Sequence, residues 1–502
     1  MRSIRALLFL LLLVLMFPWR SGSQEHARGR VYLFEGARLI TGDGSAPIEN
    51  SAFVVVDGKF IQIGKKGALR LPAGGIRIDL TGKTVMPGII DAHVHIGYAD
   101  YRNWTDGKMN YTRDNLLDHL RRAAYFGLSA VYSPGTDIAP LCYEVRDEVL
   151  AGKYADVARW IPSGPGLTSP DSAREDTQRQ DAYPITTPEQ ARMAVQELSA
   201  HKVTVIKAWV NSGGQNMFAK VPMGKDVYGA LIDEAHKHNM RVWVHDRVGE
   251  VDKGLIEAGL DGFAHEIDDI GATPDYLKTE GRPPGPDAEL LAMLRERGPK
   301  LFMTLTQPSF PGAEAERFKD PAPVLVDTVP PRILEMLRKK TQVPLAPSEE
   351  ERAQKFWDAR KVMTQQFRAT GIRIGLGSDT DHLDGKTFAA VDVWGRLSGL
   401  EIVGWAAHTE MEEMVASGIS PADVIVAATK TNAEWLGLDD LGTVAPHKTA
   451  SFVVLDANPL DDIRNTRRIN AVYLEGKEVD RKGLKAAWAN AWGKTNSIPA
   501  PQ

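Results

Sequence analysis

The chain has 502 residues, of which 43% are hydrophobic and 25% are charged, and its formal net charge is −5. This composition is typical of a globular protein, and the length suits one large domain together with a smaller one. Because no stretch is strongly basic, the sequence argues against binding to nucleic acid or to anionic lipid. The single cysteine, Cys142, excludes an intramolecular disulfide and is expected to be a small buried residue rather than a nucleophile.

The first 24 residues have the organisation of a secretory signal peptide. Two arginines precede the unbroken apolar run 6–17, and small and polar residues follow as far as Gln24. The apolar run is shorter than the about 20 residues that span a bilayer, and no cysteine follows it to carry a lipid. We therefore expect export to a secreted or periplasmic location, with cleavage near residues 21–24. An uncleaved anchor, which would be the only contact with a membrane, stays open because the cleavage pattern is imperfect.

Segments at both ends of the chain predict one small β domain. Apolar or alternating stretches bounded by Gly and Asp turns are typical of strands. Such stretches lie at 31–34, 52–56, 60–63, 76–80, 450–455 and 471–474. We therefore place a small β-sandwich domain at residues 29–84 plus 440–485.

The intervening residues 85–439 alternate strands with helices. Strands are expected at 84–91, 129–133, 159–162, 203–210, 241–245, 262–265, 300–304 and 373–378, and helices at 115–126, 188–201, 225–238 and 251–258. This alternation predicts a parallel α/β domain, either a barrel or a doubly wound sheet. His, Lys and Asp residues at the C-terminal ends of several strands favour a (β/α)₈ TIM barrel, because a barrel builds its site there.

Two connections in this region are longer than usual. Residues 164–184 are polar and contain Gly and Pro, and residues 307–347 contain many prolines. Long connections in a compact domain are often functional, so we expect both to be loops that cover the mouth of the barrel.

The first candidates for chemistry are histidines that end apolar runs. On a strand, residues two apart point to the same face, so the imidazoles of His93 and His95 lie side by side while Val94 points away. Neutral imidazole binds zinc and its neighbours among the divalent ions. His245 and His265 close two later apolar runs. One such histidine is typically a core residue, but two on successive strands after a His-x-His pair indicate a metal site.

Lys207 lies inside the apolar run 203–209, where a charged amine is costly to bury. One alternative is a lysine that reaches solvent or pairs with an acid. The other is an amine kept neutral by burial, which can capture carbon dioxide and become a carbamate. A carbamate acts as a carboxylate and can bridge two metal ions. The histidines on either side of Lys207 in the chain favour this second interpretation.

Asp379 ends the Gly-rich segment 374–379. A carboxylate at the end of a last strand can bind a metal ion and can also take a proton from an activated water. The alternative is an N-cap for the next helix, which is a common role of Asp. The four histidines favour the catalytic and metal-binding role.

In this order, the residues resemble those of the amidohydrolase superfamily, and the resemblance covers about 31–483. It implies that His93, His95 and Asp379 hold the more buried ion, that His245 and His265 hold a second, and that carboxylated Lys207 bridges the two. Zinc is the default metal, with manganese and cobalt as alternatives. Within the superfamily, the segments 206–214, 429–441 and 442–456 are similar to those of imidazolonepropionase-like and Xaa-Pro dipeptidase-like hydrolases.

The resemblance implies a binuclear amidohydrolase that cleaves an amide C–N bond by metal-activated hydroxide, in dipeptides or N-acyl amino acids. A small molecule or short peptide is therefore the expected partner, and a homo-oligomer stays open. One alternative is a lactonase, a cyclic amidase or another ester- or organophosphate-type hydrolase on the same site. A non-catalytic binding protein on the same barrel is disfavoured, because no metal ligand is missing.

Three further residues are candidates for contact with the substrate. Arg247 follows the fifth-strand histidine and could clamp a substrate carboxylate, or it could pair with Asp246 or Glu250 and only shape the loop. Tyr98 could donate a hydrogen bond to a substrate carbonyl, or it could pack in the core. His382, three residues after Asp379, could support the metal site or face solvent.

Overall fold

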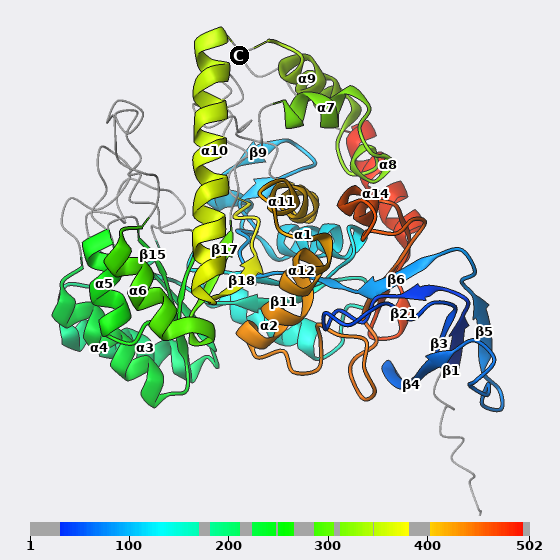
Figure 1. Cartoon of the computed structure of the whole chain (residues 1–502), viewed down its shortest axis with the longest axis horizontal. Helices are drawn as coiled ribbons and strands as arrows, with labels where there is room; N and C mark the ends of the chain where they lie inside the picture. The colour runs from blue at the N-terminus through cyan, green and yellow to red at the C-terminus, as the bar shows by residue number, and fades with distance from the viewer. Residues whose placement is uncertain are drawn as a thin grey trace, which may run out of the picture.

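The computed structural model describes residues 31–169, 181–210, 223–246, 249–265, 286–305, 312–344, 346–380 and 402–494. The predicted signal peptide, Arg247 and His382 lie outside these ranges. The fold mixes strands and helices, with the N-terminal strands at one end and the helices from α3 (Pro188–Ala200) to α6 (Ala288–Arg297) at the other (Figure 1). Within the described ranges, no helix combines the length and apolar composition needed to cross a membrane.

Two sheets bring the ends of the chain together. The four-stranded sheet has the order β4 (Lys59–Lys65), β3 (Ser51–Val56), β1 (Val31–Glu35), β5 (Ile76–Asp79). The five-stranded sheet has the order β2 (Arg38–Leu39), β6 (Thr84–Pro87), β19 (Phe452–Leu455), β20 (Ile469–Leu474), β21 (Lys477–Glu478). Strands β6 and β19 pair antiparallel, with Met86 opposite Val453. N-terminal and C-terminal segments therefore form one sheet.

Aromatic side chains from both sheets share one core. Phe34 stacks on Phe53 with 4.9 Å between ring centroids, and Phe452 stacks on Tyr473 at 4.6 Å. Phe53 and Phe452 meet edge to face at 5.3 Å, which joins the two sheets. Such a pair contributes about 0.5–1.5 kcal/mol beyond the burial of its area, so these rings hold the two chain ends against each other.

The strand predicted at 84–91 is wrong as a single element, because the structure divides it. Strand β6 belongs to the five-stranded sheet, whereas β7 (Ile89–Asp91) joins a parallel sheet. Gly88 separates the two strands and lies so close to Ser129 that a Cβ at this position would be 2.6 Å from the Ser129 Cβ. The chain can therefore leave one sheet and enter the other without a break in its apolar pattern, which is why the pattern alone did not reveal the change.

The remaining long strands form two parallel sheets. One has the order β11 (Arg159–Pro162), β10 (Leu128–Ser133), β7. The other has the order β13 (Tyr183–Pro184), β12 (Leu167–Thr168), β14 (Val205–Trp209), β15 (Arg241–His245), β16 (Gly262–Phe263), β17 (Phe302–Leu305), β18 (Arg373–Leu376). The predicted parallel α/β region is therefore present, with its strands within a few residues of their expected positions.

Contacts beyond the strands connect the two parallel sheets. The Ala92 N–H donates to the Leu376 carbonyl at 3.1 Å, and Val94 pairs with Thr380 in a parallel bridge. The Gly166 N–H donates to the Gly135 carbonyl at 2.7 Å. The segments that follow β7 and β18 therefore meet at the C-terminal ends of the strands, where the candidate residues lie, and so do the segments that follow β10 and β11.

Helices pack around these sheets. Those between the parallel strands are α1 (Arg113–Tyr125), α2 (Leu141–Leu150), α3, α4 (Lys225–Lys237), α5 (Gly249–Glu257) and α6. Later elements are α11 (Trp405–Ala416), α12 (Pro421–Val426), the π-helical turn η6 (Ala427–Thr431), α13 (Asn432–Leu436), the 3₁₀ turn η7 (Ile463–Arg467) and α14 (Arg481–Lys494). Shorter elements are β8 (Ala99–Asp100), β9 (Thr105–Asp106), η1 (Lys108–Asn110) and η4 (Gly298–Lys300).

The prediction of a long loop at 307–347 is wrong, because most of its described residues are helical. They form α7 (Ala313–Lys319), α8 (Pro323–Val326) and α9 (Pro331–Thr341), followed by the long helix α10 (Pro347–Thr370) (Figure 1). Three of these helices begin at a proline. Proline is well tolerated in the first turn of a helix, because an N–H there has no partner within the helix. The prolines mark helix starts rather than a loop.

Candidate metal centre

His93 lies two residues after β7 and is 1% exposed. Its Nδ1 lies 2.7 Å from the carbonyl oxygen of Ala264, which accepts the hydrogen bond. A carbonyl can only accept, so Nδ1 carries the proton and Nε2 presents its lone pair. That Nε2 lies 2.9 Å from Oδ1 of Asp379. The Ala264 carbonyl therefore selects the tautomer that a metal ligand needs.

His95 presents its ring to the same carboxylate. Its Nε2 lies 3.2 Å from Oδ1 of Asp379, and its Nδ1 lies 2.9 Å from the hydroxyl of Thr136. Thr136 is buried in the segment after β10. Thr136 is not among the residues predicted from the sequence. No local pattern marks it, because it reaches His95 only through the fold.

Asp379 stands three residues after β18 in the left-handed backbone region, with φ of 47°. Non-glycine residues rarely adopt this conformation, and when they do it is often at a functional site. The Asp379 N–H donates to the His93 carbonyl at 2.6 Å, which fixes the turn. Nearby, a Cβ on Gly377 would be 2.6 Å from the His93 Cβ. Only a glycine lets the last strand come this close. The N-cap alternative involves residues after 380, which lie outside the described part.

The ligand atoms of His93, His95 and Asp379 lie within 4.8 Å of one another. Burial lowers the pKa of His93 to about 4. Burial acts to raise the pKa of Asp379, but His93 and His95 lower it by more, so it lies well below its ordinary value. Near neutral pH these groups are a neutral imidazole and an ionised carboxylate, the forms that coordinate a divalent cation. The donor set therefore fits the metal that the sequence predicts.

Asp91, the last residue of β7, supports both sides of this cluster. Its carboxylate accepts hydrogen bonds from the Ser378 hydroxyl at 2.6 Å, from the Ser378 N–H at 3.1 Å and from the His93 N–H at 3.1 Å. Burial raises the pKa of Asp91 to about 6, although the hydrogen bonds from Ser378 act in the opposite direction. The signal for Asp91 was present in the sequence as an acidic residue that ends an apolar strand two positions before His93.

Asn432 connects β7 and β18 through hydrogen bonds to both strands. Its Nδ2 donates to the carbonyl oxygens of Ile90 and Leu376, at 2.7 Å each. Gly375 makes room for it, because a Cβ there would be 2.2 Å from the Asn432 Oδ1. Asn432 is not among the predicted site residues, although it lies inside the segment 429–441 on which part of the resemblance rests.

Lys207 is 1% exposed in the centre of β14. Its Nζ lies 5.5 Å from the ring centroids of both Trp209 and Trp243. A Cβ on Gly135 would be 2.8 Å from the Lys207 Cγ, so the segment after β10 packs directly over the side chain. The interpretation of Lys207 as a lysine that reaches solvent is therefore wrong.

His245 and His265 lie next to each other, at the end of β15 and just after β16. The His265 Nε2 is 2.5 Å from the His245 Nδ1, and the ring centroids are 4.3 Å apart. The His265 ring also stacks with the ring of His93, with 6.4 Å between centroids and 12° between planes. A histidine predicted to bind the second ion therefore lies beside a histidine predicted to bind the first.

Tyr98 is buried, and its hydroxyl donates to the Thr136 carbonyl at 2.9 Å. This contact supports the segment that holds Thr136 against His95. The two other residues predicted to contact the substrate lie outside the described part of the chain.

Part of the chain matches a known protein family and curated relatives. Residues 323–479 match the amidohydrolase family, a range that includes Asp379 and Asn432. A segment of 104 residues is 28% identical to the enamidase of Eubacterium barkeri, and it spans 20% of this chain and 25% of the enamidase. Both matches are to members of the amidohydrolase superfamily. The curated relatives are matched over only part of their length.

Solved structures resemble this chain over nearly its whole length. A putative prolidase from Bifidobacterium longum is 24% identical, with a TM-score of 0.62, and the match covers 92% of this chain and 99% of the other. Phenylurea hydrolase B is 18% identical, with a TM-score of 0.68 and coverage of 91% and 98%. At these identities the similarity establishes the fold alone.

Proposed function

We propose that this protein is a binuclear metal-dependent hydrolase that cleaves an amide C–N bond in a dipeptide or an N-acyl amino acid. The observation that carries the proposal is the convergence of His93, His95 and Asp379 on one point, with ligand atoms within 4.8 Å of one another. Three protein donors are typical of catalytic rather than purely structural metal sites.

A second ion would be held by His245 and His265. Lys207, on the strand next to His245, would bridge the ions once it is carboxylated. The burial of Lys207 supports this assignment, because a buried lysine is more readily deprotonated and only the neutral amine reacts with carbon dioxide. Zinc is the first metal to test, because imidazole nitrogens predominate among the donors.

Bound divalent ions would supply Lewis acidity, which lowers the pKa of water and polarises a carbonyl. The protein's own contribution would be proton transfer by Asp379, whose side chain is 26% exposed and therefore the most accessible of the three convergent groups. Its Oδ1 faces both histidines, so we assign proton transfer to Oδ2. The proton would pass from water to Oδ2 and then to the leaving nitrogen.

The dipeptide class is supported by the similarity to the putative prolidase. N-acyl amino acids are included because they contain the same type of amide bond. The similarity to phenylurea hydrolase B and to the enamidase makes other C–N bonds the first alternatives. A screen of X-Pro dipeptides, N-acyl amino acids, aryl ureas, cyclic amides and lactones on the metal-loaded protein tests the substrate class. We expect turnover of the first two groups. Activity confined to lactones would contradict the cleavage of an amide bond.

Metal content tests the centre independently of substrate. Elemental analysis of the purified protein should find two divalent ions per chain, and ¹³C-bicarbonate should label one carbamate carbon. Lys207→Arg keeps a cation but is not expected to form the carbamate, so it should lose the label and most of the metal. A variant that keeps both ions and full turnover would exclude the bridging role of Lys207.

We also propose the finer architecture that the sequence predicts: a (β/α)₈ barrel at 85–439, a small β-sandwich at 29–84 plus 440–485, and export directed by residues 1–24. Mass spectrometry of the protein recovered from culture medium or periplasm gives the mature N-terminus. A mature chain that starts near residues 21–25 supports export, whereas an intact N-terminus on a cytoplasmic protein contradicts it.

A further inference from the structure

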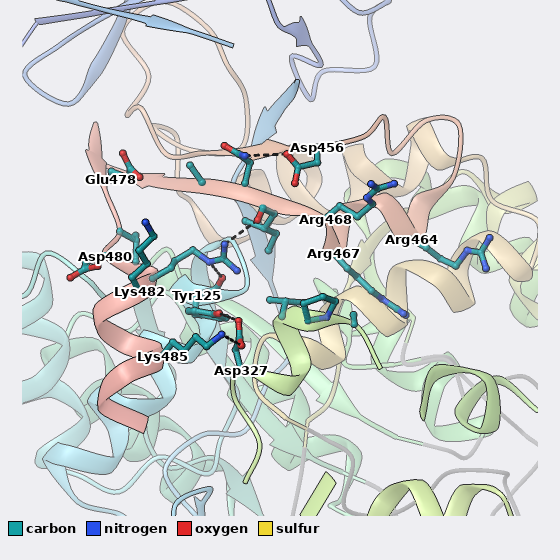
Figure 2. Close-up of a pocket in the computed structure, with 18 residues that line it drawn as sticks. Tyr125, Asp327, Asp456, Arg464, Arg467, Arg468, Glu478, Asp480, Lys482 and Lys485 are labelled. Atoms are coloured by element: carbon teal, nitrogen blue, oxygen red, sulfur yellow. Dashed lines mark hydrogen bonds and ion pairs between the residues drawn. The ribbon is translucent and has the colours of Figure 1, made fainter. Parts of the chain in front are cut away.

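A cavity lies away from the metal centre, between α14, the segment from η7 to β20, and α8. Its volume is about 880 Å³, within the range of small-molecule sites, and none of the six candidate metal ligands lines it. Lys482 and Lys485 reach it from α14, while Arg464, Arg467 and Arg468 come from the other side (Figure 2).

Acidic side chains that line this cavity already have partners. Asp327 accepts a hydrogen bond from the Tyr125 hydroxyl at 2.6 Å and pairs with the Lys485 Nζ at 2.6 Å. Asp456 pairs with the Lys83 Nζ at 2.6 Å. The dashed contacts at Asp327 are visible in Figure 2. These carboxylates are therefore not available to neutralise further cations.

The two remaining acids accept hydrogen bonds from neutral donors, which orients their carboxylates but leaves their charge. Glu478 accepts a hydrogen bond from the Tyr473 hydroxyl at 3.1 Å. Asp480 precedes α14 and accepts from the Gly483 N–H at 2.9 Å, which caps the first turn of the helix. Neither forms an ion pair with an arginine or lysine of the cavity among the described residues.

Two of the arginines are neutralised by acidic side chains. Arg464 pairs with Asp462 at 2.7 Å. Arg467 pairs with Glu412 and stacks over the Trp405 ring, with its guanidinium carbon 4.4 Å from the ring centroid. These side chains shape the wall of the cavity without adding net charge to it.

Three cations remain without a carboxylate. Within the described part of the chain, the side chains of Arg468 and Lys482 make no hydrogen bond or ion pair. Arg481 is held in place, because its Nε and Nη1 donate to the carbonyl oxygens of Tyr125 and Ile469 at 3.0 Å each. Its guanidinium also stacks over the Tyr125 ring at 4.3 Å. Neither carbonyl carries a charge, so the cation of Arg481 is oriented but not neutralised.

We propose that this cavity binds a small-molecule oxyanion with two or more negative charges, carried on phosphate or carboxylate groups. Arg481 provides a fixed anchor whose orientation is already determined by the fold, so little conformational entropy is lost when it binds. Arg468 and Lys482 are exposed and can each add a charge-assisted hydrogen bond. The site is separate from the metal centre and needs no metal.

Isothermal titration calorimetry of the metal-loaded full-length protein with inorganic pyrophosphate, and separately with tricarballylate, tests this proposal. We expect at least one of them to bind, and the one that binds identifies phosphate or carboxylate as the preferred group. The double variant Arg468→Ala/Lys482→Ala should weaken binding by at least about tenfold, the loss expected for a charge-assisted hydrogen bond. Both residues are exposed, and an unchanged melting temperature without ligand checks that the fold is intact.

A matched control is the double variant Arg70→Ala/Lys59→Ala, which removes an exposed arginine and lysine that pair with no acid among the described residues. It should bind like the natural protein. Because pyrophosphate can also bind metal ions, a His95→Ala variant separates the two sites and should retain binding. The proposal is overturned if neither anion binds or if both double variants lose affinity equally. It is also overturned if the His95→Ala variant loses binding while the Arg468→Ala/Lys482→Ala variant keeps it.

Discussion

Asp379 and His93 are joined twice, through their side chains at 2.9 Å and through the Asp379 N–H and the His93 carbonyl at 2.6 Å. His93 follows β7 and Asp379 follows β18, and these two strands lie far apart in the chain. The backbone contact positions the carboxylate of Asp379, and the side-chain contact with His93 lowers its pKa. Asp379 both shapes the turn and provides a ligand atom. A substitution that keeps the size of its side chain but removes the negative charge should therefore separate these two roles.

Asp379→Asn keeps the size and the backbone hydrogen bond but removes the negative charge. We expect bound metal to fall, and turnover to fall by about 10²- to 10⁴-fold, the contribution typical of a positioned proton carrier. Elemental analysis and steady-state kinetics measure the two effects. Asp320→Asn, an exposed position remote from the ligands, is the control and should change neither quantity. Unchanged metal and turnover in Asp379→Asn would remove Asp379 from the centre.

Thr136 orients His95 through a hydroxyl 2.9 Å from Nδ1. Thr136→Val keeps the shape of the side chain and removes the hydrogen bond, so we expect metal affinity to fall by about 10- to 100-fold, as for other partners of metal-bound histidines. Competition with a chromogenic chelator measures the affinity. Thr136→Ser restores the hydroxyl and should recover most of it. Equal affinities in both variants would mean that the contact does not orient the ring.

His95 could be predicted from the sequence, whereas Thr136, which bonds to it, could not. The spacing of His93 and His95, the acid after the last strand and the buried lysine are local signals, because each depends on the residue type and the apolar run beside it. Thr136 and Asn432 have no such signal. Their roles depend on hydrogen bonds between segments far apart in the chain, and only the assembled strands bring those segments together.

The errors in the fold have similar physical causes. An uninterrupted apolar pattern hid the change of sheet at Gly88, because both strands on either side of it are buried. The prolines at 323, 331 and 347 favour a loop in the sequence, but each lies at the start of a helix. The same residue that breaks a helix interior is accepted at its first turn, so proline marks a boundary without saying on which side the helix lies.

Asp137 should make stability depend on pH. Burial raises the pKa of Asp137 to about 8, even though hydrogen bonds from Ser133 and Gly164 act to lower it. The ordinary value is 3.8, so between about pH 4 and pH 8 the folded protein holds a proton that the unfolded chain has released. The stabilisation is complete below pH 4 and is lost as the pH rises towards 8, by at most about 1.4 kcal/mol per pH unit.

Chemical denaturation at a series of pH values, compared with Asp137→Asn, measures this contribution. His119 and His408, whose pKa burial lowers to about 4, oppose the trend below pH 6.5, but they are common to both proteins and cancel in the difference. Burial also raises the pKa of the neighbouring Tyr111 and Cys142, so both stay neutral in this window. A difference that stays constant from pH 4 to pH 8 would mean that Asp137 is ionised in the folded state.

Gly377 allows the last strand to approach the first, and a single methyl group should disturb both the fold and the metal centre. In Gly377→Ala the new Cβ would be 2.6 Å from the His93 Cβ and 2.8 Å from the Thr304 Cβ, distances that force the chain apart. We expect a loss of about 1–3 kcal/mol in the free energy of unfolding, as for overpacked cores, together with weaker metal binding. Gly229→Ala is the matched control, because a Cβ there meets nothing within 4 Å inside α4. It should stabilise the protein by about 0.5–1 kcal/mol and leave bound metal unchanged, whereas a Gly377→Ala variant with unaltered stability and metal content would show that the close approach of β18 to His93 is not required.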